Sequence, residues 1–374
     1  MLQDISVVIC AYTEQRWNEL LNAVSSVQNQ TLPATDIIVV IDGNASLYRK
    51  AKEHLQNAIV IENRFMKGLS GARNSGAAIA RGQIIAFLDD DAVACPAWLE
   101  ELRKCYLDER VVGVGGKLTP LWESTRPGWF PEEFNWVVGC TYRGMASDKT
   151  QVRNMIGANM SMRRDIWESV GGFREAFGCD KDSGAKQGTV KWLQHYAGDE
   201  ETEFCIRVTR QMPGSIWLYN ACAIVEHHVS KERMRWGYFI WRCYDEGLGK
   251  ASLVKLHDSQ LGLASERAYV FKVLPAGVLR GIIDAVVRGD ITGLARAAAI
   301  IIGLLMAVIG YLVGTVVSRL RYSLAPATVL SIIIGFVWFY HLWKYMTVSS
   351  TYLKLLSLAS VTVWLMLLMH CLKW

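Results

Sequence analysis

The chain has 374 residues, enough for one large domain or two of ordinary size, and 51% of them are apolar. Most of the apolar excess lies after about residue 295, so the composition indicates a soluble part followed by a membrane part. The net charge of +5 is mild and the basic residues form no long run, so we expect no nucleic-acid partner. Nine dispersed cysteines without a CxxC pair are typical of reduced thiols in a cytosol-facing domain.

The first part of the chain alternates between strand-like and helix-like segments. The N-terminus has no basic signal-peptide region, and apolar β-rich runs predict strands at residues 5–10, 36–42, 58–62, 83–88 and 111–115. The apolar face of residues 17–28 predicts a helix, Ser70 can cap a second helix that runs to Arg81, and Pro96 begins a third. This alternation predicts an α/β fold with a mostly parallel sheet covered by helices.

The middle of the chain is less regular. Residues 121–139 contain three tryptophans and little periodicity, and residues 178–188 form a poorly patterned stretch of Gly, Lys and Asp. The tryptophans can contact an acceptor or lipid, or belong to the core. Residues 198–211 predict a helix with acidic residues at its start, and SIWLYN and CAIVEHH predict two further strands.

The last part of the chain predicts attachment to a membrane. Three apolar segments are candidate spans, at residues 297–317, 324–342 and 351–372, although each can also be a buried core helix. Residues 270–288 mix apolar and basic positions, as an amphipathic interfacial helix does. We therefore expect a large globular domain at residues 1–250, an interfacial linker at residues 251–296 and a membrane region at residues 297–374.

The distribution of arginines predicts the orientation. Arg280, Arg288 and Arg296 precede the first candidate span, which places the N-terminal domain on the cytoplasmic side of the cell membrane. Arg319 and Arg321 in the next link fit an outside loop poorly, so the number of spans, from one to three, stays open.

The run QIIAFLDDDAV ends a predicted buried strand with Asp89, Asp90 and Asp91. Adjacent carboxylates repel one another, so they lie in a solvated turn or beside a cation. The first strand is followed by AYTEQRW, without the glycines of a dinucleotide-binding or Walker loop. The negative charge of bound phosphates must then be neutralised in another way. Carboxylates at a strand end can hold Mg²⁺ or Mn²⁺, which then binds the phosphates.

Three motifs in order, VVICAYTE, VVIDGN and GLSGARNSGAAIARGQIIAFLDDD, resemble the inverting glycosyltransferases of family 2. IGANMSMRRDIWESVGGF and GDEETEFCIR extend the resemblance, which covers about residues 5–250. It implies the GT-A fold, a Rossmann-like mixed sheet flanked by helices, and a nucleotide-sugar donor. The donor-binding residues implied by the resemblance are Tyr12, Glu14, Asp42, Arg73, Asp89 and Asp90.

The resemblance also implies a metal site. Asp91, the last acid of the D-x-D, would be the direct ligand, with Asp89 beside it. His227 in VEHH would complete the site, with His228 as its rival; a lone histidine in a strand is more often structural. The metal would stabilise the departing diphosphate.

The catalytic base implied by the resemblance is one of two adjacent glutamates. Alignment on Arg207 puts Glu201 where the family usually has an aspartate, and the longer side chain keeps Glu200 as an alternative. The carboxylate would take the proton of the acceptor hydroxyl as it attacks the sugar. Acidic residues also favour a helix N-terminus without any catalytic role.

The acceptor side is implied by two segments. ERMRW resembles the Q-x-x-R-W of polymerising members and points to Arg235 and Trp236, and IGANMSM points to Asn159. Residues 232–241 can equally form an amphipathic helix on the membrane, with interfacial aromatic side chains.

Together these features predict a membrane-anchored, metal-dependent inverting glycosyltransferase that passes a sugar from a UDP-sugar to a lipid-linked or cell-surface glycan acceptor. AYTEQRW and GLSGARN look most like the branch of glucosyl-dolichyl-phosphate glucuronosyltransferases, in which Arg143 or Arg153 would pair with a uronate. A processive polysaccharide synthase is an alternative that ERMRW favours and the small number of spans disfavours. A non-catalytic nucleotide-sugar-binding membrane protein is another, disfavoured by the complete set of acids, Asp42, Asp89, Asp91 and Glu201.

Overall fold

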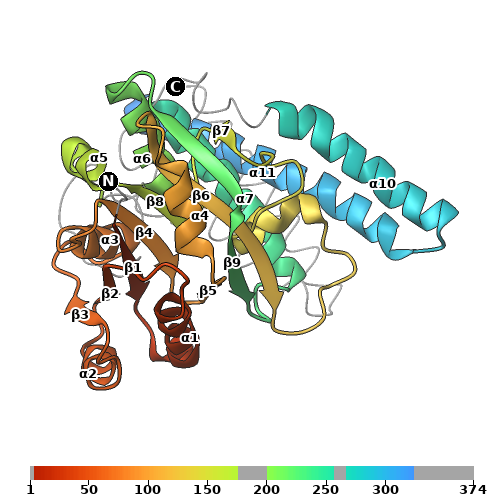
Figure 1. The fold of residues 1–374 in the computed structure, drawn as a ribbon. Coiled ribbons are helices and arrows are strands. Elements are labelled where there is room, and N and C mark those ends of the chain that lie inside the picture. The colour runs from red at the N-terminus through yellow and green to blue at the C-terminus, as the bar shows by residue number, and fades with distance from the viewer. Residues whose placement is uncertain (1–3, 176–199, 257–266, 324–374) are drawn as a thin grey trace, which may run out of the picture. The chain divides into compact units, whose positions relative to one another are not determined.

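The computed structural model describes residues 4–175, 200–256 and 267–323 (Figure 1). By its internal contacts the chain divides into two compact units, Met1–Tyr311 and Leu312–Trp374. The first unit contains the sheet and nearly all of the described helices. The predicted segments at 178–188, 324–342 and 351–372 lie outside the described residues.

The elements follow the predicted alternation. The strands are β1 (Ile5–Ala11), β2 (Asp36–Ile41), β3 (Ile59–Glu62), β4 (Ile84–Asp89), β5 (Ala92–Ala94), β6 (Val111–Trp122), β7 (Thr150–Val152), β8 (Asn159–Arg163) and β9 (Ile216–Val229). The α-helices are α1 (Trp17–Gln28), α2 (Ala45–His54), α3 (Leu69–Ala77), α4 (Trp98–Cys105), α5 (Arg164–Val170), α6 (Glu200–Gln211), α7 (Trp236–Leu256), α10 (Leu274–Val287) and α11 (Thr292–Ser323). Two 3₁₀ helices are η1 (Glu14–Arg16) and η2 (Glu132–Val138), and η4 (Tyr269–Val273) is a short π-helix.

The strands form one mixed sheet in the order β3-β2-β1-β4-β8-β6-β9-β5, with β7 paired to β9. The β1–β4 half is parallel, as predicted, whereas β8 is antiparallel to both β4 and β6 and makes the sheet mixed. The sheet flanked by helices confirms the predicted α/β architecture. SIWLYN and CAIVEHH are not two strands but one, β9, whose register on β6 is interrupted between Asn220 and Ile224.

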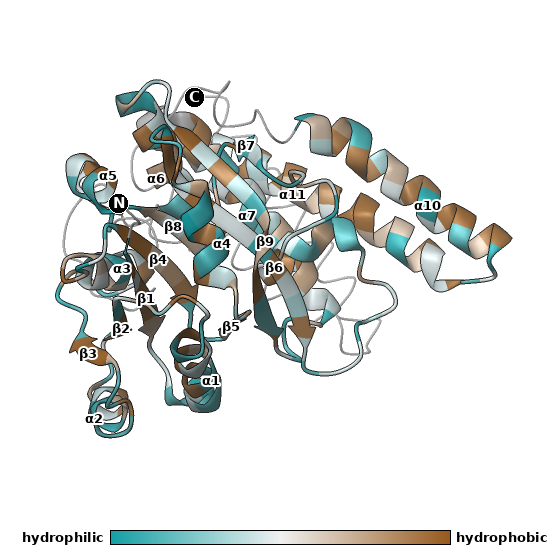
Figure 2. Cartoon of the chain, viewed as in Figure 1, coloured by the Kyte–Doolittle hydropathy of each residue, from teal (hydrophilic) through white to brown (hydrophobic). Residues whose placement is uncertain are grey.

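The parallel strands are buried on both faces, which explains their continuous apolar runs. In β1, Val7 and Ile9 pack with Leu20 of α1 on one face, whereas Val8 packs with Ala72 of α3 on the other. Figure 2 draws these strands in brown along their length. The two helix layers thereby hold the carboxyl ends of β1, β2 and β4 at one edge.

Helix α3 differs from its prediction at both ends. It begins at Leu69 after Gly68, which has a φ of 135°, and it ends at Ala77 rather than at Arg81. Ser70 is therefore inside the helix and buried instead of capping it. The backbone N–H of Gly68 donates to Oδ2 of Asp42 at 2.9 Å, so a carboxylate from β2 holds the start of the helix.

Asp36 at the start of β2 has a structural role that predicts a pH-dependent stability. Its buried carboxylate accepts from the Ser6 hydroxyl at 2.9 Å, and from the backbone N–H (3.0 Å) and Nε (2.8 Å) of Arg81. Burial alone would raise the pKa of Asp36, but the bonds from Arg81 and Ser6 outweigh it and hold the pKa below its usual value. We expect Asp36→Asn to lower the free energy of unfolding by about 1–3 kcal/mol at pH 7.

Because the folded-state pKa of Asp36 is lowered, its contribution is full above the unfolded pKa of about 4 and is lost as the pH falls through the folded value. Urea unfolding of the full chain in detergent should therefore show a smaller difference between Asp36→Asn and the parent at pH 3 than at pH 7. The exposed Asp108, paired with Arg110, is the control, and Asp108→Asn should change little at either pH. A constant difference for Asp36→Asn would contradict the assignment.

Helices α7 and α11 pack closely against each other. A Cβ at Gly247 of α7 would lie 2.0 Å from the carbonyl oxygen of Ala307 in α11, and one at Gly310 would lie 2.0 Å from that of Tyr244. Only glycine permits this close crossing of α7 and α11. Residues 292–316 of α11 are long and apolar enough to cross a membrane, with a mean hydropathy of 2.5 in an 18-residue window, and they overlap the candidate span predicted at 297–317. The predicted link at 318–323 is helical.

Candidate active site

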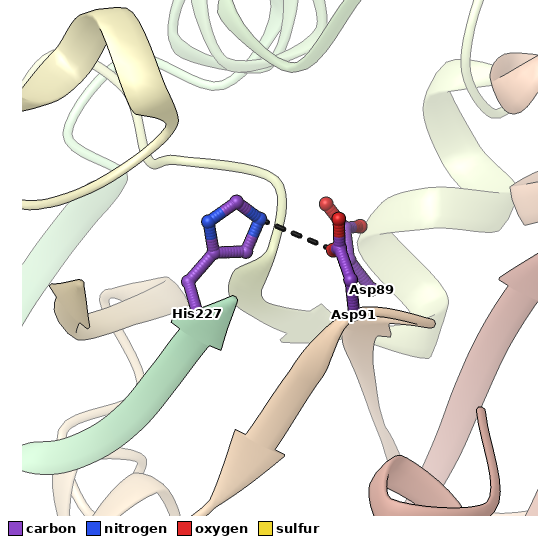
Figure 3. Close-up of side chains that lie close together, drawn as sticks. All are labelled: Asp89, Asp91 and His227. Atoms are coloured by element: carbon purple, nitrogen blue, oxygen red, sulfur yellow. Dashed lines mark ion pairs between the residues drawn. The ribbon is translucent and has the colours of Figure 1, made fainter. Parts of the chain in front are cut away.

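Strand pairing brings two aspartates and a histidine that are far apart in the sequence close together in space. Asp89 ends β4 and Asp91 follows in the turn to β5, whose Ala92 is paired with His227 of β9. Ligand atoms of Asp89, Asp91 and His227 all lie within 4.8 Å of one another. Figure 3 shows the three side chains converging, with His227 Nε2 3.2 Å from Asp91 Oδ1. The predicted three-residue cluster is thus assembled from two strand ends.

Two arginines that the sequence did not single out complete the charge pattern. Arg16 lies 2.6 Å from Asp90 Oδ1 and 3.2 Å from Asp91 Oδ2, and Arg233 lies 3.4 Å from the latter oxygen. Burial alone would lower the pKa of His227, but Asp91 outweighs it and raises that pKa to about 10. A metal ion bound by His227 would therefore have to displace this proton from the imidazole.

Asp90 is held differently from its neighbours. Burial raises its pKa to about 7, against the opposing effect of Arg16. Its Oδ2 is buried and has no hydrogen-bond partner among the described residues. A buried acceptor of this kind is costly unless a bound ligand satisfies it.

Arg73 occupies the wall beside the cluster. Its guanidinium lies 2.9 Å from Glu200 Oε1 and 3.6 Å from Asp89 Oδ1, and both Arg73 and Glu200 are almost fully buried. A Cβ at Gly157 would lie 2.3 Å from this guanidinium, so the glycine provides the space for it. Glu200 is therefore the buried partner of Arg73, whereas the adjacent Glu201 is only partly buried.

One cavity of about 1270 Å³ joins these groups. It extends from the ends of β1, β2 and β4 past η2 to α7, η4 and α11. Nine of the predicted residues line it: Tyr12, Asp42, Arg73, Asp89, Asp90, Asp91, Glu200, Glu201 and His227. Asp42 also accepts from Asn63 at 2.7 Å, so it orders the loop before α3 as well as lining the cavity.

Four predicted residues lie elsewhere. Glu14 is exposed on η1 and does not line the cavity. Asn159 is fully buried: its Oδ1 accepts from the Trp98 indole at 2.8 Å, and its Nδ2 donates to the carbonyl oxygens of Lys117 and Ala223. This network ties β8 to its neighbours and leaves no side-chain surface for an acceptor, so the acceptor-side prediction for Asn159 is corrected.

The ERMRW segment reaches the cavity through a different arginine. Arg233 lines the cavity wall, whereas Arg235 and Trp236 do not. Trp236 stacks on Phe239 at 5.4 Å between ring centroids and meets Trp129 edge-on at 4.7 Å, which anchors the start of α7. Arg233 thus replaces Arg235 and Trp236 as the residue of this segment that faces the cavity, because motif position does not tell which residues of a turn face inward.

Comparison with known proteins identifies the family. The sequence model described as "Glycosyl transferase family 2" matches residues 6–171. A glucosyl-dolichyl phosphate glucuronosyltransferase of Haloferax volcanii is 33% identical over 250 residues, which cover 66% of this chain and 76% of the relative. The chain belongs to glycosyl transferase family 2.

Other similarities of the family 2 chain are more distant. A probable N-acetylgalactosaminyltransferase of Caenorhabditis elegans is 27% identical over 191 residues, covering 45% of this chain and 33% of the relative. A mannosyltransferase of Pyrobaculum calidifontis, solved with GDP-Man and Mn²⁺, aligns with a TM-score of 0.48 at 16% identity, over 82% of this chain and 87% of the other. Family membership makes the chain a transferase, and together with the mixed sheet it confirms the predicted GT-A fold.

In this family 2 enzyme, the side-chain atoms of the Asp89, Asp91 and His227 cluster are of the kinds that bind a divalent metal ion. Two carboxylates and one imidazole offer oxygen and nitrogen ligands within 4.8 Å of one another, of the types that Mg²⁺ and Mn²⁺ accept. The orphaned oxygen of Asp90 lies in the same turn and is a further acceptor for a cation or a donor hydroxyl. The residues present are consistent with the predicted metal site.

Proposed function

We propose that this glycosyltransferase is a membrane-bound, inverting enzyme that uses a divalent cation to pass a sugar from a UDP-sugar to a lipid-linked acceptor. One observation carries the proposal. The Asp89, Asp91 and His227 cluster lines the same cavity as Glu201, and this cavity continues to α11, the helix that is long and apolar enough to cross a bilayer.

On the donor side, each residue has a role. Tyr12 and Asp42 would bind the nucleoside at the ends of β1 and β2. Asp89, Asp91 and His227 would hold Mg²⁺ or Mn²⁺, whose charge stabilises the departing diphosphate. Arg73 fixes Glu200 and Asp89 in place, which keeps the wall between the donor and the acceptor rigid.

On the acceptor side, Glu201 is the proposed base. An acceptor hydroxyl attacks C1 of the sugar from the face opposite the nucleotide, and its proton passes to the Glu201 carboxylate. The new bond from C1 to the acceptor oxygen forms as the bond from C1 to the phosphate oxygen breaks, and the anomeric configuration inverts. Glu201 is favoured over Glu200 because Glu200 is buried against Arg73.

The identity of the sugar is a narrower proposal. The name of the Haloferax relative supports glucuronate as the transferred sugar and a glucosyl lipid phosphate as the acceptor. Arg153 lines the cavity and is the candidate partner for the uronate carboxylate. Arg143, the alternative in the sequence, is instead paired with Glu132 away from the cavity.

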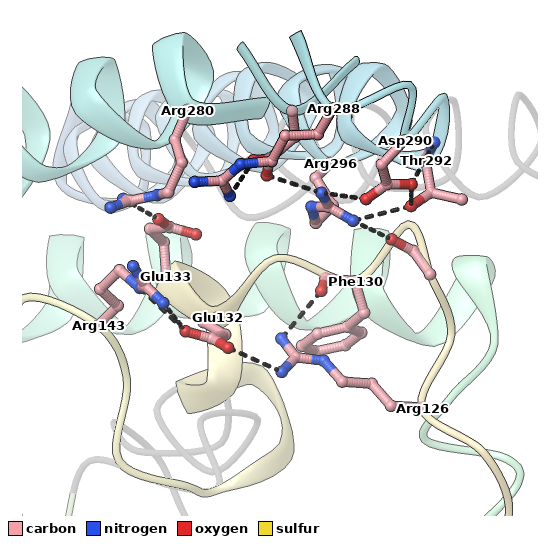
Figure 4. A network of polar contacts seen from close by, with 12 residues as sticks. Arg126, Phe130, Glu132, Glu133, Arg143, Arg280, Arg288, Asp290, Thr292 and Arg296 are labelled. Carbon is pink, nitrogen blue, oxygen red and sulfur yellow. Dashed lines mark hydrogen bonds and ion pairs between the residues drawn. The ribbon is translucent and has the colours of Figure 1, made fainter. Parts of the chain in front are cut away.

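Membrane attachment is supported by α10, which turns apolar residues outward and polar residues toward the protein, the opposite of a surface helix in a soluble protein. Its outward side carries apolar residues, among them Val286 and Val287, which are 78% and 75% exposed. Its polar residues face the protein: Arg280 pairs with Glu133 at 2.7 Å (Figure 4). Asp284 pairs with Arg296 at 2.9 Å. We infer that α10 lies in the bilayer interface, with the catalytic domain on the cytoplasmic side of the cell membrane.

A fluorescent label tests the position of α10. An environment-sensitive dye on Val287→Cys should be quenched by brominated lipids in nanodiscs, in a background where Cys222, which is exposed, and Cys179 and Cys371, which lie outside the described residues, are replaced by serine. The matched control is Leu107→Cys, since Leu107 is 82% exposed and lies in the loop after α4. Equal, weak quenching at both sites would mean that α10 lies in water and that the interfacial proposal is wrong.

Donor turnover tests the proposed activity. Full-length protein in lipid nanodiscs would be given UDP-, GDP- and dTDP-sugars with Mn²⁺ or with EDTA, and release of the nucleoside diphosphate would be measured. We expect release from one UDP-sugar, increased by lipid extract and lost with EDTA. Donor binding without release, even with lipid extract, would favour a nucleotide-sugar-binding protein over an enzyme.

A further inference from the structure

One side of α7 presents a regular polar stripe to the cavity. Tyr238, Arg242, Glu246 and Lys250 follow one another at intervals of four residues, and all of them line the cavity wall. Residues four apart lie on the same face of a helix, so the stripe extends along the helix for roughly 18 Å. It begins one short turn of chain after Arg233, which contacts Asp91. The stripe therefore leads away from the catalytic cluster.

The part of the cavity lining that α11 contributes is apolar. Leu304, Ala307, Val308 and Tyr311 of α11 line it at spacings of three and four residues. They belong to the segment that is long and apolar enough to cross a membrane. The close crossing at Gly247 and Gly310 holds the two helices together beside these walls. A groove with one charged and one apolar wall suits an amphiphile rather than a free sugar.

The charges of the stripe are arranged in local pairs. Arg242 lies 2.7 Å from Asp245, and Lys250 lies 3.1 Å from Glu246. Both cations are largely shielded from water, with 25% and 14% of their side chains exposed. A guanidinium has five donors in a planar fork, so Arg242 can bind a phosphate while it keeps a bond to Asp245.

We propose that this α7–α11 groove is the acceptor subsite, and that Arg242 binds the phosphate of a lipid-linked glycosyl phosphate. The proposal rests on the proposed function. Arg242 lies along α7 beyond Arg233 and Tyr238, and it lines the same cavity as the catalytic cluster and the apolar residues of α11, so we assign it to the link between sugar and lipid. The sugar then points toward Glu201, and the lipid follows α11.

Lys250 is the outer cation of the groove. It lies two helical turns beyond Arg242, about 12 Å along the axis, so it serves the approach of the anionic headgroup rather than the bound phosphate. Lys250→Gln should therefore weaken acceptor binding less than Arg242→Gln does.

The test measures binding and turnover separately on the full-length protein in detergent. The probe is glucose linked through phosphate to a short, water-soluble isoprenoid alcohol, with octyl glucoside as the uncharged comparison. Arg242→Gln should raise the Kd and the KM of the phosphate probe by about 10- to 100-fold and leave octyl glucoside unchanged. Arg242→Lys should recover part of the loss, because it retains the charge without the planar fork.

Two controls distinguish this effect from damage to the fold. Arg242→Gln combined with Asp245→Asn removes the cation without leaving its partner unpaired, and it should behave like the single variant. Lys104→Gln on α4 removes an exposed surface cation and should change nothing. Release of nucleoside diphosphate in the absence of acceptor should be the same in Lys104→Gln as in the parent.

The outcomes separate the two proposals. Equal binding of the phosphate probe by Arg242→Gln and the parent overturns the subsite, even if donor turnover is normal. Binding that depends on Arg242 in a protein that turns over no donor supports the subsite and contradicts the proposed activity. Equal weakening of octyl glucoside and of the phosphate probe would make the groove a sugar site without phosphate recognition, which also overturns the proposal.

Discussion

Replacing Asp91 with asparagine is expected to reduce sugar transfer by about a thousandfold, since the charge stabilisation that a metal ion supplies is worth several kcal/mol. The substitution removes the carboxylate that meets His227, Arg16 and Arg233, while its backbone oxygen can still accept from the N–H of His228 at 2.8 Å. The local strand pairing should therefore survive. Nucleoside diphosphate release with saturating Mn²⁺ measures the loss.

A direct metal-binding measurement makes this prediction independent of activity. Titration calorimetry with Mn²⁺ on the full-length protein should give a weaker affinity for Asp91→Asn and for His227→Ala, and no change for the surface control Asp108→Asn. If Asp91→Asn binds Mn²⁺ as tightly as the parent does, the cluster is an ion-pair network and the cation is held elsewhere.

Replacing Glu201 with glutamine is expected to lower kcat by about 10²- to 10⁴-fold, because an amide cannot take the acceptor proton. Donor affinity should be unchanged, since the proposed nucleoside and metal ligands lie at or just after the ends of β1, β2 and β4 and on β9, whereas Glu201 is on α6. Steady-state transfer together with equilibrium binding of the donor separates the two effects. Glu201→Asp should recover part of kcat.

Glu200→Gln is the matched variant for the neighbouring carboxylate. Glu200 and Arg73 form a buried pair at 2.9 Å, and removal of one partner of such a pair costs about 3–5 kcal/mol. We expect a clear fall in thermal stability for Glu200→Gln and none for Glu201→Gln. If Glu200→Gln instead abolishes kcat in a stable protein while Glu201→Gln remains active, Glu200 is the base.

The parts of the site that lie at strand ends were predictable from the sequence. Continuous apolar runs give the buried strands, and in a parallel sheet their carboxyl ends meet at one edge, so Asp42 and Asp89 could be brought together without coordinates. His227 needed more, because its position depends on the antiparallel pairing of β5 with β9. Only its motif suggested it, since β5 is three residues long and gives no signal of its own.

The residues that the sequence did not disclose are those whose partners are decided by tertiary packing. Arg16 and Arg233 each stand in a quoted motif, yet nothing in AYTEQRW or ERMRW tells which charged side chain turns inward. Asn159 is the converse case: it is a polar residue in a family motif, but its side-chain amide makes hydrogen bonds within the fold instead of facing the cavity. Ser70 has a side chain that can cap a helix, but Gly68, two residues earlier, takes the N-cap position.

The pairing of β5 with β9 also has a consequence for how the protein matures. Asp89 and Asp91 are synthesised early, and His227 emerges only after β6, β7 and β8 have been added to the growing chain. Until β9 takes its place, the two aspartates lack the histidine that would be the third ligand of the proposed cation site. Under that proposal, a nascent or truncated chain that ends before residue 227 should not bind the ion tightly.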